Sequence, residues 1–164
     1  MAKIGVISDS HDHVPNLKRA VELFCAEDVE LVVHAGDFIS PFTVPPLVAL
    51  KCPVIAVLGN NDGEKVGLHA RFAAIGTKLE PKMATAVAGG VRIAVVHEPE
   101  PVDALAASGM YDLVVYGHTH AIDVLEGECL VLNPGEAGGW TTGRATVALV
   151  TGEAGALRAE IRDL

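Results

Sequence analysis

The sequence predicts an α/β (α+β) protein whose core is two mixed β-sheets flanked by helices. The first half alternates apolar runs with a helical pattern, which is typical of βαβ units. The second half consists mostly of paired apolar runs joined by glycine-containing turns, which is typical of hairpins. Five apolar runs also end in Asp, Asn or His, and parallel strands bring such ends to one edge of a sheet. A purely parallel, doubly wound sheet is therefore not expected.

The first half should begin with a strand–helix–strand unit. The strand Ile4–Ile7 is followed by a helix starting near Pro15, because proline suits the first turn and Asp12 or His13 can cap it. The strand Leu31–Val33 should then run parallel to the first. Next come a proline-rich loop with a short helix, a third strand and a second helix, at Ser40–Leu50, Val54–Leu58 and 64–76.

The second half should be mostly β-structure. Glycine-containing turns separate its apolar runs into three hairpins. The paired runs are Met83–Ala88 with Val91–Val96, Asp123–Leu125 with Cys129–Leu132, and Ala145–Val150 with Ala156–Ile161. A helix is expected over Pro101–Ser108, before a strand at Leu113–Tyr116.

Length and composition are those of one ordinary globular domain. A chain of 164 residues, 50% hydrophobic and 20% charged, is most economically a single domain over residues 1–164. No apolar run approaches the roughly 20 residues of a membrane span, and the first strand begins too early to leave room for a signal peptide. The three widely spaced cysteines are expected to be free thiols. We therefore expect a cytoplasmic protein without a membrane partner.

The charge of the chain bears on its ligands. The net charge is −9, and no basic stripe is visible in the sequence. Such a protein repels a long nucleic acid, whereas a small phosphate ester can still reach metal ions bound at one site.

The polar residues at the strand ends are of metal-ligand types. They are Asp9 and His11, Asp37, Asn60, His97, and His118 and His120. Singly, each has an ordinary explanation, since Asp and Asn form turns and a lone His is usually a hydrogen-bonded core or surface residue. The pair His118 and His120 is more specific, because alternate positions at a strand end can aim both rings at one ion. Together, the seven residues predict a metal site.

The order of these motifs resembles that of the calcineurin-like metallophosphoesterases, and within them the small single-domain phosphodiesterases of bacteria and archaea. The motifs are Asp-x-His, Gly-Asp, Gly-Asn-x-Asp, a strand-end His and Gly-His-x-His, followed by Asn133-Pro134-Gly135. The resemblance covers nearly the whole chain. It implies a four-layer αββα sandwich of two mixed β-sheets flanked by helices, with two divalent metal ions per chain.

The resemblance also implies a ligand set for each ion. One ion would be held by Asp9, His11, Asp37 and His120. The other would be held by Asp37, Asn60, His97 and His118, with Asp37 bridging the two ions. Asp37, Asn60 and His97 are also predicted to be catalytic.

The donor types fit this assignment and indicate a reaction. Carboxylate and imidazole without thiolate suit Mn²⁺, our first expectation, and also Ni²⁺, Fe²⁺, Co²⁺ or Zn²⁺. A bridging carboxylate can hold two ions about 3.5–4 Å apart, and a hydroxide between them can attack phosphorus. The predicted function is therefore a metal-dependent phosphodiesterase that hydrolyses small phosphate esters through a metal-bridging hydroxide.

Two other functions remain open at this stage. The same fold serves as a protein-binding scaffold in the retromer coat, although the complete ligand set argues against that function here. A phosphomonoesterase or nucleotidase would share the chemistry and differ only in the shape of its pocket. A homo-oligomer also remains open, because glycine-rich and apolar surface permits a dimer but no motif encodes one.

Other polar residues near the motifs have weaker assignments. His13, His34 and His69 match no ligand position. His13 is expected to cap a helix or lie at the surface, with a contact to a substrate phosphate as the alternative, and His34 is expected to pack beside the site. Asp62 is expected to orient a ligand or its own loop, and Glu98 to face solvent.

One position and one loop bear on substrate. Many members of the wider superfamily have a His where this chain has Asn61, and that His protonates the leaving group, which an amide cannot do at neutral pH. The segment Gly139–Arg144 is expected either to cover the substrate, with Arg144 contacting phosphate, or to pack Trp140 against the domain edge or a subunit interface.

Overall fold

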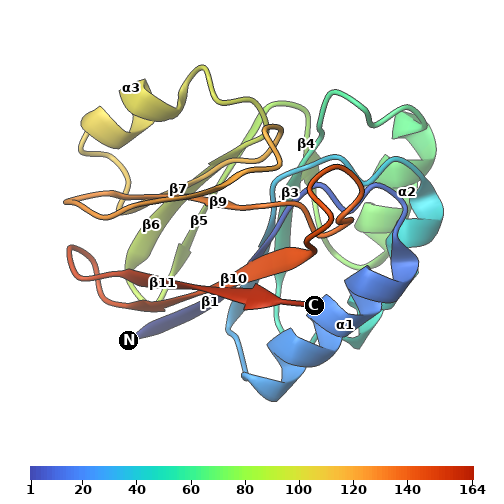
Figure 1. Ribbon diagram of the computed structural model, residues 1–164, viewed down its shortest axis with the longest axis horizontal. Helices are drawn as coiled ribbons and strands as arrows, with labels where there is room; N and C mark the ends of the chain where they lie inside the picture. Colours follow the sequence, from blue (N-terminus) through green and yellow to red (C-terminus); the bar gives the residue numbers. More distant parts are fainter.

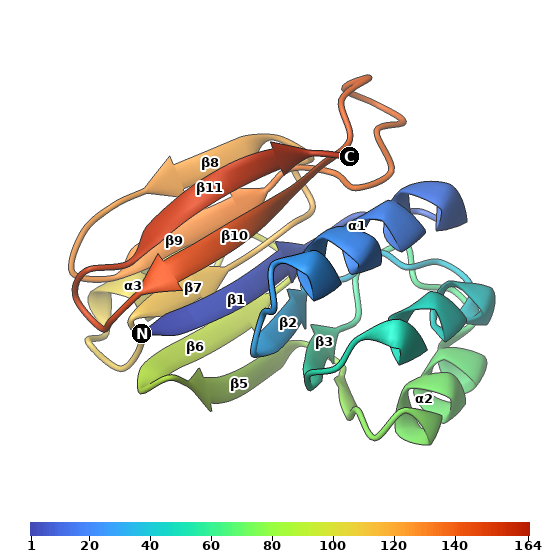
Figure 2. The same cartoon turned by 90° about the horizontal axis from the view of Figure 1, so that it is seen from below.

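The structure, a computed structural model of residues 1–164, has two β-sheets packed between helices (Figure 1 and Figure 2). Helices α1 (Val14–Ala26) and α2 (Lys65–Ala74) cover one sheet, and α3 (Val102–Ala107) covers the other. The predicted four-layer αββα sandwich is confirmed.

The first sheet has six strands in the order β11-β10-β1-β2-β3-β4. Their bounds are β1 Ala2–Ile7, β2 Leu31–His34, β3 Val54–Val57, β4 Leu79–Glu80, β10 Thr146–Gly152 and β11 Arg158–Asp163. Strands β1 to β4 are parallel neighbours, whereas β10 is antiparallel to both β1 and β11. The sequence did not predict β4, because two residues are too few to show a hydrophobic period.

The second sheet has five strands in the order β5-β6-β7-β9-β8. Their bounds are β5 Met83–Ala88, β6 Val91–Val96, β7 Leu113–Val115, β8 Ile122–Leu125 and β9 Leu130–Pro134. Strands β6, β7 and β9 are parallel, and β5 and β8 are antiparallel to their neighbours. Both sheets are thus mixed, and all three predicted hairpins are confirmed.

Strand β1 contributes to two hydrophobic cores because its side chains alternate between the faces of the first sheet. Ile4 and Val6 pack in the core between the two sheets, and Ile7 packs in the core beneath the helices. Gly5 also faces the helices, where a Cβ atom would lie 2.7 Å from the ring of Phe24. The absence of a side chain at Gly5 therefore lets α1 approach the sheet closely.

Helix α1 forms where the sequence predicts it. Its buried apolar residues recur at helical spacing, at Leu17, Ala20, Val21 and Phe24. The Nδ1 atom of His13 accepts a hydrogen bond from the backbone N–H of Asn16 at 3.1 Å, so His13 is the N-cap. In the proline-rich segment, two 3₁₀ helices at Pro41–Thr43 and Pro45–Ala49 replace the predicted loop and short helix.

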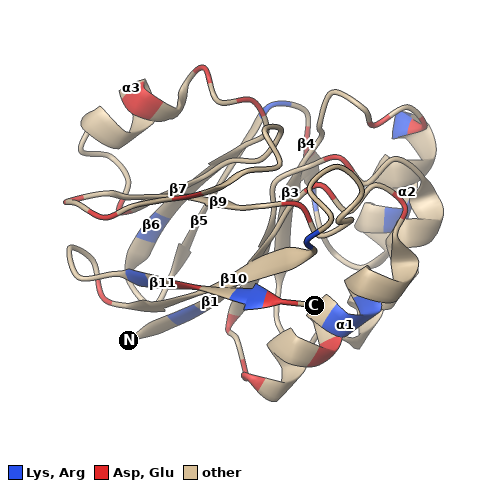
Figure 3. Ribbon diagram, in the orientation of Figure 1, with Lys and Arg blue, Asp and Glu red and all other residues tan.

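Basic side chains are dispersed over α1, α2, β6 and β11 and are interleaved with acidic ones (Figure 3). Several of them form ion pairs, including Lys3 with Glu27, and Arg92 with Asp112. The three cysteines are free, as predicted. None of the helices has both the length and the apolar character needed to cross a membrane.

Candidate metal centre

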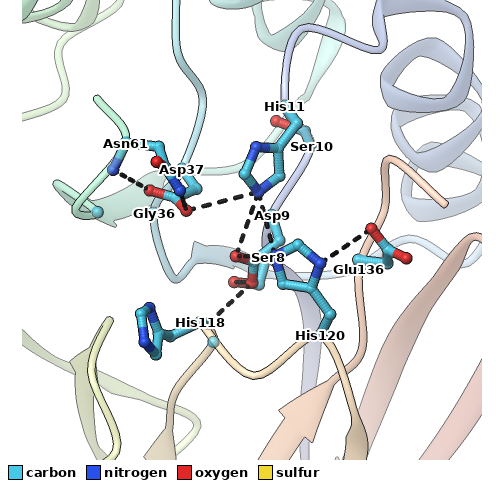
Figure 4. Close-up of polar contacts among 12 residues, drawn as sticks. Ser8, Asp9, Ser10, His11, Gly36, Asp37, Asn61, His118, His120 and Glu136 are labelled. Atoms are coloured by element: carbon cyan, nitrogen blue, oxygen red, sulfur yellow. Dashed lines mark hydrogen bonds and ion pairs between the residues drawn. The ribbon is translucent and has the colours of Figure 1, made fainter. Parts of the chain in front are cut away.

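All seven predicted ligand residues come together at one end of the two sheets. Each follows the carboxyl end of a parallel strand: β1, β2 and β3 in the first sheet, and β6 and β7 in the second. The sheets pack face to face, so loops far apart in the sequence meet above them. Figure 4 shows the side chains of Asp9, His11, Asp37 and His120 from three of these loops close together, with the imidazole of His118 to one side.

The first group consists of Asp9, His11, Asp37 and His120. One potential ligand atom from each lies within 4.8 Å of the other three. The Nε2 atom of His11 is 3.2 Å from Nε2 of His120 and 3.4 Å from Oδ2 of Asp37. The Nε2 atom of His120 is 3.3 Å from Oδ1 of Asp9. Two imidazole nitrogens and two carboxylates thus converge, as ligands of one cation do.

The second group consists of Asp37, Asn60, His97 and His118. The Oδ1 atom of Asn60 is 2.8 Å from Nε2 of His97 and 2.9 Å from Nδ1 of His118. His97 Nε2 lies 3.4 Å from Oδ2 of Asp37, the oxygen that is also 3.4 Å from His11 Nε2. One carboxylate oxygen therefore lies between the two groups, where a bridging ligand would be.

A carboxylate oxygen of Asp9 shows that these residues fit a cation. Oδ2 of Asp9 accepts hydrogen bonds from the Ser8 hydroxyl and from the backbone N–H of His118. Oδ1 is buried and has no hydrogen-bond partner in the protein. A buried polar atom without a partner is destabilising, and a metal ion coordinated by Oδ1 would satisfy it.

Hydrogen bonds on the outer side of two imidazoles set which nitrogen faces each group. Nδ1 of His97 is 2.7 Å from the backbone oxygen of Ala35, which can only accept. Nδ1 of His120 is 2.7 Å from Oγ1 of Thr141 and 3.1 Å from Oε2 of Glu136. These acceptors place the proton on Nδ1, so the Nε2 lone pair of each ring is available to a metal ion.

The electrostatics of the site favour positive charge. Burial lowers the pKa of His97, but the hydrogen bond and the negative charge of Asp37 outweigh it and raise the pKa to about 8. The nearby carboxylate of Asp9, whose Oδ1 lies 3.6 Å from Nε2 of His11, raises the pKa of His11. Burial raises the pKa of Asp37, whereas contacts with His97 and Asn61 lower it to about 2. The same negative field would attract a divalent cation, which would take the place of the proton on Nε2.

Five of the seven residues have a left-handed backbone, which residues other than glycine seldom adopt. The φ angles are 53° at Asp9, 42° at His11, 58° at Asp37, 68° at His118 and 60° at His120. Each such residue costs about 1 kcal/mol or more, and such strain concentrates at functional sites. The strained backbone conformations of these loops thus direct the five side chains toward the site.

Asp62 connects two of the ligand loops. Its carboxylate accepts hydrogen bonds from the backbone N–H groups of Asp37 at 3.1 Å, Gly59 at 2.7 Å and Ile39 at 2.7 Å. Gly59 lies so close to Asp37 that a Cβ atom there would overlap the carboxylate. The prediction that Asp62 orients a ligand or its loop is confirmed.

Asn61 has a role that the sequence did not reveal. Its backbone N–H donates to Oδ1 of Asp37 at 2.9 Å, and its side-chain amide donates to Oδ2 at 2.8 Å. Both oxygens of the carboxylate between the two groups are therefore fixed by one neighbour. Asn61 supplies no acidic proton, but it orients Asp37.

Glu136 is the residue of the site that sequence reasoning missed. Its fully buried carboxylate faces Nδ1 of His120, on the side away from the first group (Figure 4). It also accepts hydrogen bonds from Trp140, Thr141 and Thr142, whose donors lower its pKa although burial raises it. A sequence signal did exist: Glu136 follows β9, which is parallel to β7 and so ends at the same edge.

The remaining histidines lie outside both groups. His34 is buried, packs on the ring of Phe38 and accepts a hydrogen bond from the backbone N–H of Gly36 at 3.1 Å, as expected of a packed neighbour. Burial lowers the pKa of His34 to about 3. His69 is exposed on α2.

Two further expectations need refinement. The guanidinium of Arg144 pairs with Asp163 on β11, at 2.6 Å and 3.1 Å, a partner that the sequence did not predict. Glu98 is only partly exposed and lies 3.5 Å from Lys82 Nζ.

The chain combines two mixed sheets between helices with a carboxylate–imidazole site where the parallel strands end. This combination defines a metallophosphoesterase with an αββα fold. The sequence model of the calcineurin-like phosphoesterase superfamily domain matches residues 2–155, and the chain belongs to that superfamily.

Relatives of this chain agree with that assignment. The phosphodiesterase MJ0936 of Methanocaldococcus jannaschii is 37% identical over 155 residues, which cover 92% of this chain and 93% of that protein. A solved archaeal phosphodiesterase superposes with a TM-score of 0.88 at 35% identity, covering 98% of this chain and 99% of the other. Vps29 of Chaetomium thermophilum superposes with a TM-score of 0.70 at 18% identity, covering 100% and 97%, which shows the shared fold alone.

Proposed function

We propose that residues 1–164 form one metallophosphoesterase domain that hydrolyses small phosphodiesters with two divalent metal ions. The position of Asp37 Oδ2, 3.4 Å from an imidazole nitrogen in each group, carries this proposal. A single carboxylate oxygen between two sets of donors is the arrangement that a dinuclear centre requires.

The proposed ligands follow the two groups. Asp9, His11, Asp37 and His120 would hold one ion, and Asp37, Asn60, His97 and His118 the other. Oxygen and imidazole donors without thiolate support Mn²⁺ first, with Ni²⁺, Fe²⁺, Co²⁺ and Zn²⁺ as other candidates. Superfamily membership supports metal dependence, and the similarity to MJ0936 supports diesters as the substrate class.

The protein's own residues prepare the site for the reaction. When bound, the metal ions would activate water and neutralise charge on the phosphoryl oxygens. Asn61 and Asp62 hold Asp37 from two sides, one through its carboxylate and the other through its backbone. Backbone and side-chain acceptors hold the rings of His97 and His120 with Nε2 toward the site. Because these contacts exist before substrate arrives, little reorganisation is needed during the reaction.

The test is an assay of purified protein, depleted of metal and then supplied with Mn²⁺, on aryl diesters, aryl monoesters and cyclic nucleotides. We expect metal-dependent turnover, fastest with aryl diesters, and its loss in His118→Ala. The control is His69→Ala, which removes an exposed imidazole from α2.

The outcomes separate the three candidate functions. Faster turnover of monoesters than of diesters would favour the phosphomonoesterase, and bound metal without turnover of any ester would favour the scaffold.

A further inference from the structure

Trp140 is exposed and yet firmly held. It is the only tryptophan of the chain, and 64% of its surface is accessible to solvent. Its indole Nε1–H donates to the backbone oxygen of His11 at 3.1 Å, and its backbone N–H donates to Oε2 of Glu136 at 3.1 Å. Exposed side chains are usually mobile, so an indole held through its own N–H, on a backbone that is also bonded, is preorganised for contact.

The loop that carries Trp140 borders the first metal group. Trp140 contacts the backbone of His11, and its neighbour Thr141 contacts the imidazole of His120 through Oγ1 at 2.7 Å. Figure 1 and Figure 2 show this loop, between β9 and β10, beside the loop that follows β1 and the start of α1. The exposed indole therefore stands next to two candidate ligands.

A second ring supports the indole. The imidazole of His13 lies with its centroid 5.0 Å from that of Trp140, and the ring planes are inclined by 58°. His13 is itself fixed, because its Nδ1 atom caps α1. The two rings form an aromatic corner at the rim of the site, and the exposed surface of Trp140 has no partner within the chain.

We propose that Trp140 forms an aromatic subsite, and that the substrates are phosphodiesters in which one ester group carries a planar aromatic ring. This inference rests on the proposed phosphodiesterase function and names its substrate class. Stacking on an indole is favourable for any flat π-system and typically changes affinity by about tenfold.

The polar groups around Trp140 indicate how selective the subsite is. The hydroxyl groups of Thr141 and Thr142 bond to Glu136, and the indole N–H bonds to His11. The side-chain donors of Trp140, Thr141 and Thr142 are therefore already engaged within the chain. Recognition therefore depends on ring stacking, and different aromatic groups should bind similarly.

The test compares diphenyl phosphate and diethyl phosphate as ligands of the Mn²⁺-loaded protein by calorimetry, over times in which no phenol or ethanol is released. The wild type should bind diphenyl phosphate about tenfold more tightly. Trp140→Ala should abolish this preference, whereas Trp140→Phe, which keeps a ring but loses the bond to His11, should retain most of it. The control Met110→Ala, which truncates an apolar side chain 61% exposed after α3, should behave as wild type.

Fluorescence supplies an independent readout, because Trp140 is the only tryptophan. Diphenyl phosphate should change its emission, and diethyl phosphate should not. An unchanged preference in Trp140→Ala, its loss in Trp140→Phe as well, or no preference in the wild type would overturn the subsite. Failure of the proposed function would look different: no diester would be hydrolysed, whatever the binding ratio.

Discussion

Glu136→Gln is the substitution whose effect follows most directly from the structure. Oε1 accepts bonds from the backbone and hydroxyl groups of Thr141 and Thr142, while Oε2 faces the backbone N–H of Trp140 and Nδ1 of His120. Glutamine has the same shape but only one accepting oxygen. If that oxygen keeps the four bonds of Oε1, its NH₂ group must face two donors.

The magnitude can be worked out from those two lost contacts. A buried donor left without an acceptor costs about 1–3 kcal/mol, so losing two such contacts should lower the unfolding free energy of the metal-free protein by about 2–6 kcal/mol. A histidine ligand that loses its carboxylate partner typically binds metal 10–100-fold more weakly. We therefore expect weaker Mn²⁺ binding at the site containing His120, with the other site little affected.

Calorimetric titration with Mn²⁺ and thermal unfolding of the metal-free protein measure the two effects separately. Glu98→Gln is the matched control, because it removes a carboxylate next to a candidate ligand in the sequence while its only ion pair is with Lys82. A Glu136→Gln protein that is destabilised but binds both ions with wild-type affinity would refute the positioning role of Glu136.

Four further results are expected. Asp37→Ala should lose metal at both sites and all activity, whereas His120→Ala should lose mainly one ion, as measured by elemental analysis. Two ions retained per chain in Asp37→Ala would contradict the assignment of Asp37 as the bridging ligand. A chelator should lower the melting temperature, because ions at a hundredfold excess over Kd stabilise the folded state by about 2.7 kcal/mol; an unchanged midpoint on removing bound metal would count against a folded-state site. Since Asn61 donates no acidic proton, rates should fall steeply as leaving-group pKa rises, and a flat plot would reveal another acid. The pKa of His34 is lowered to about 3 in the fold, so its contribution to the unfolding free energy is complete above pH 6.5 and declines toward pH 3 by about 1.4 kcal/mol per pH unit. His34→Gln should flatten this decline in unfolding titrations. An unaltered pH profile in that variant would contradict the assignment of the decline to His34.

The strand-end pattern was sufficient to predict the residues that meet at the site. Parallel strands bring their carboxyl ends to one edge, so Asp9, Asp37 and His97 could be expected to converge before any coordinates were known. Their precise aim could not be predicted, because it depends on left-handed backbone at Asp9 and Asp37 that only long-range packing enforces.

Residues that act through other residues were harder to predict. The contact of Glu136 with His120 depends on two separate loops meeting, and no local pattern records such a meeting. Asn61 was considered only as a missing acid, whereas its amide fixes the carboxylate of Asp37. Arg144 was considered as one possible phosphate contact, and its pairing with Asp163 on β11 depends on the hairpin of β10 and β11, which brings the two residues together.

Anomalous diffraction from crystals grown with Mn²⁺ would test the dinuclear site most directly. We expect two manganese peaks about 3.5–4 Å apart, one on each side of Asp37 Oδ2, with Asp9 Oδ1 coordinated to the first. A single peak, or two peaks that do not share Asp37, would contradict the proposed two-metal site.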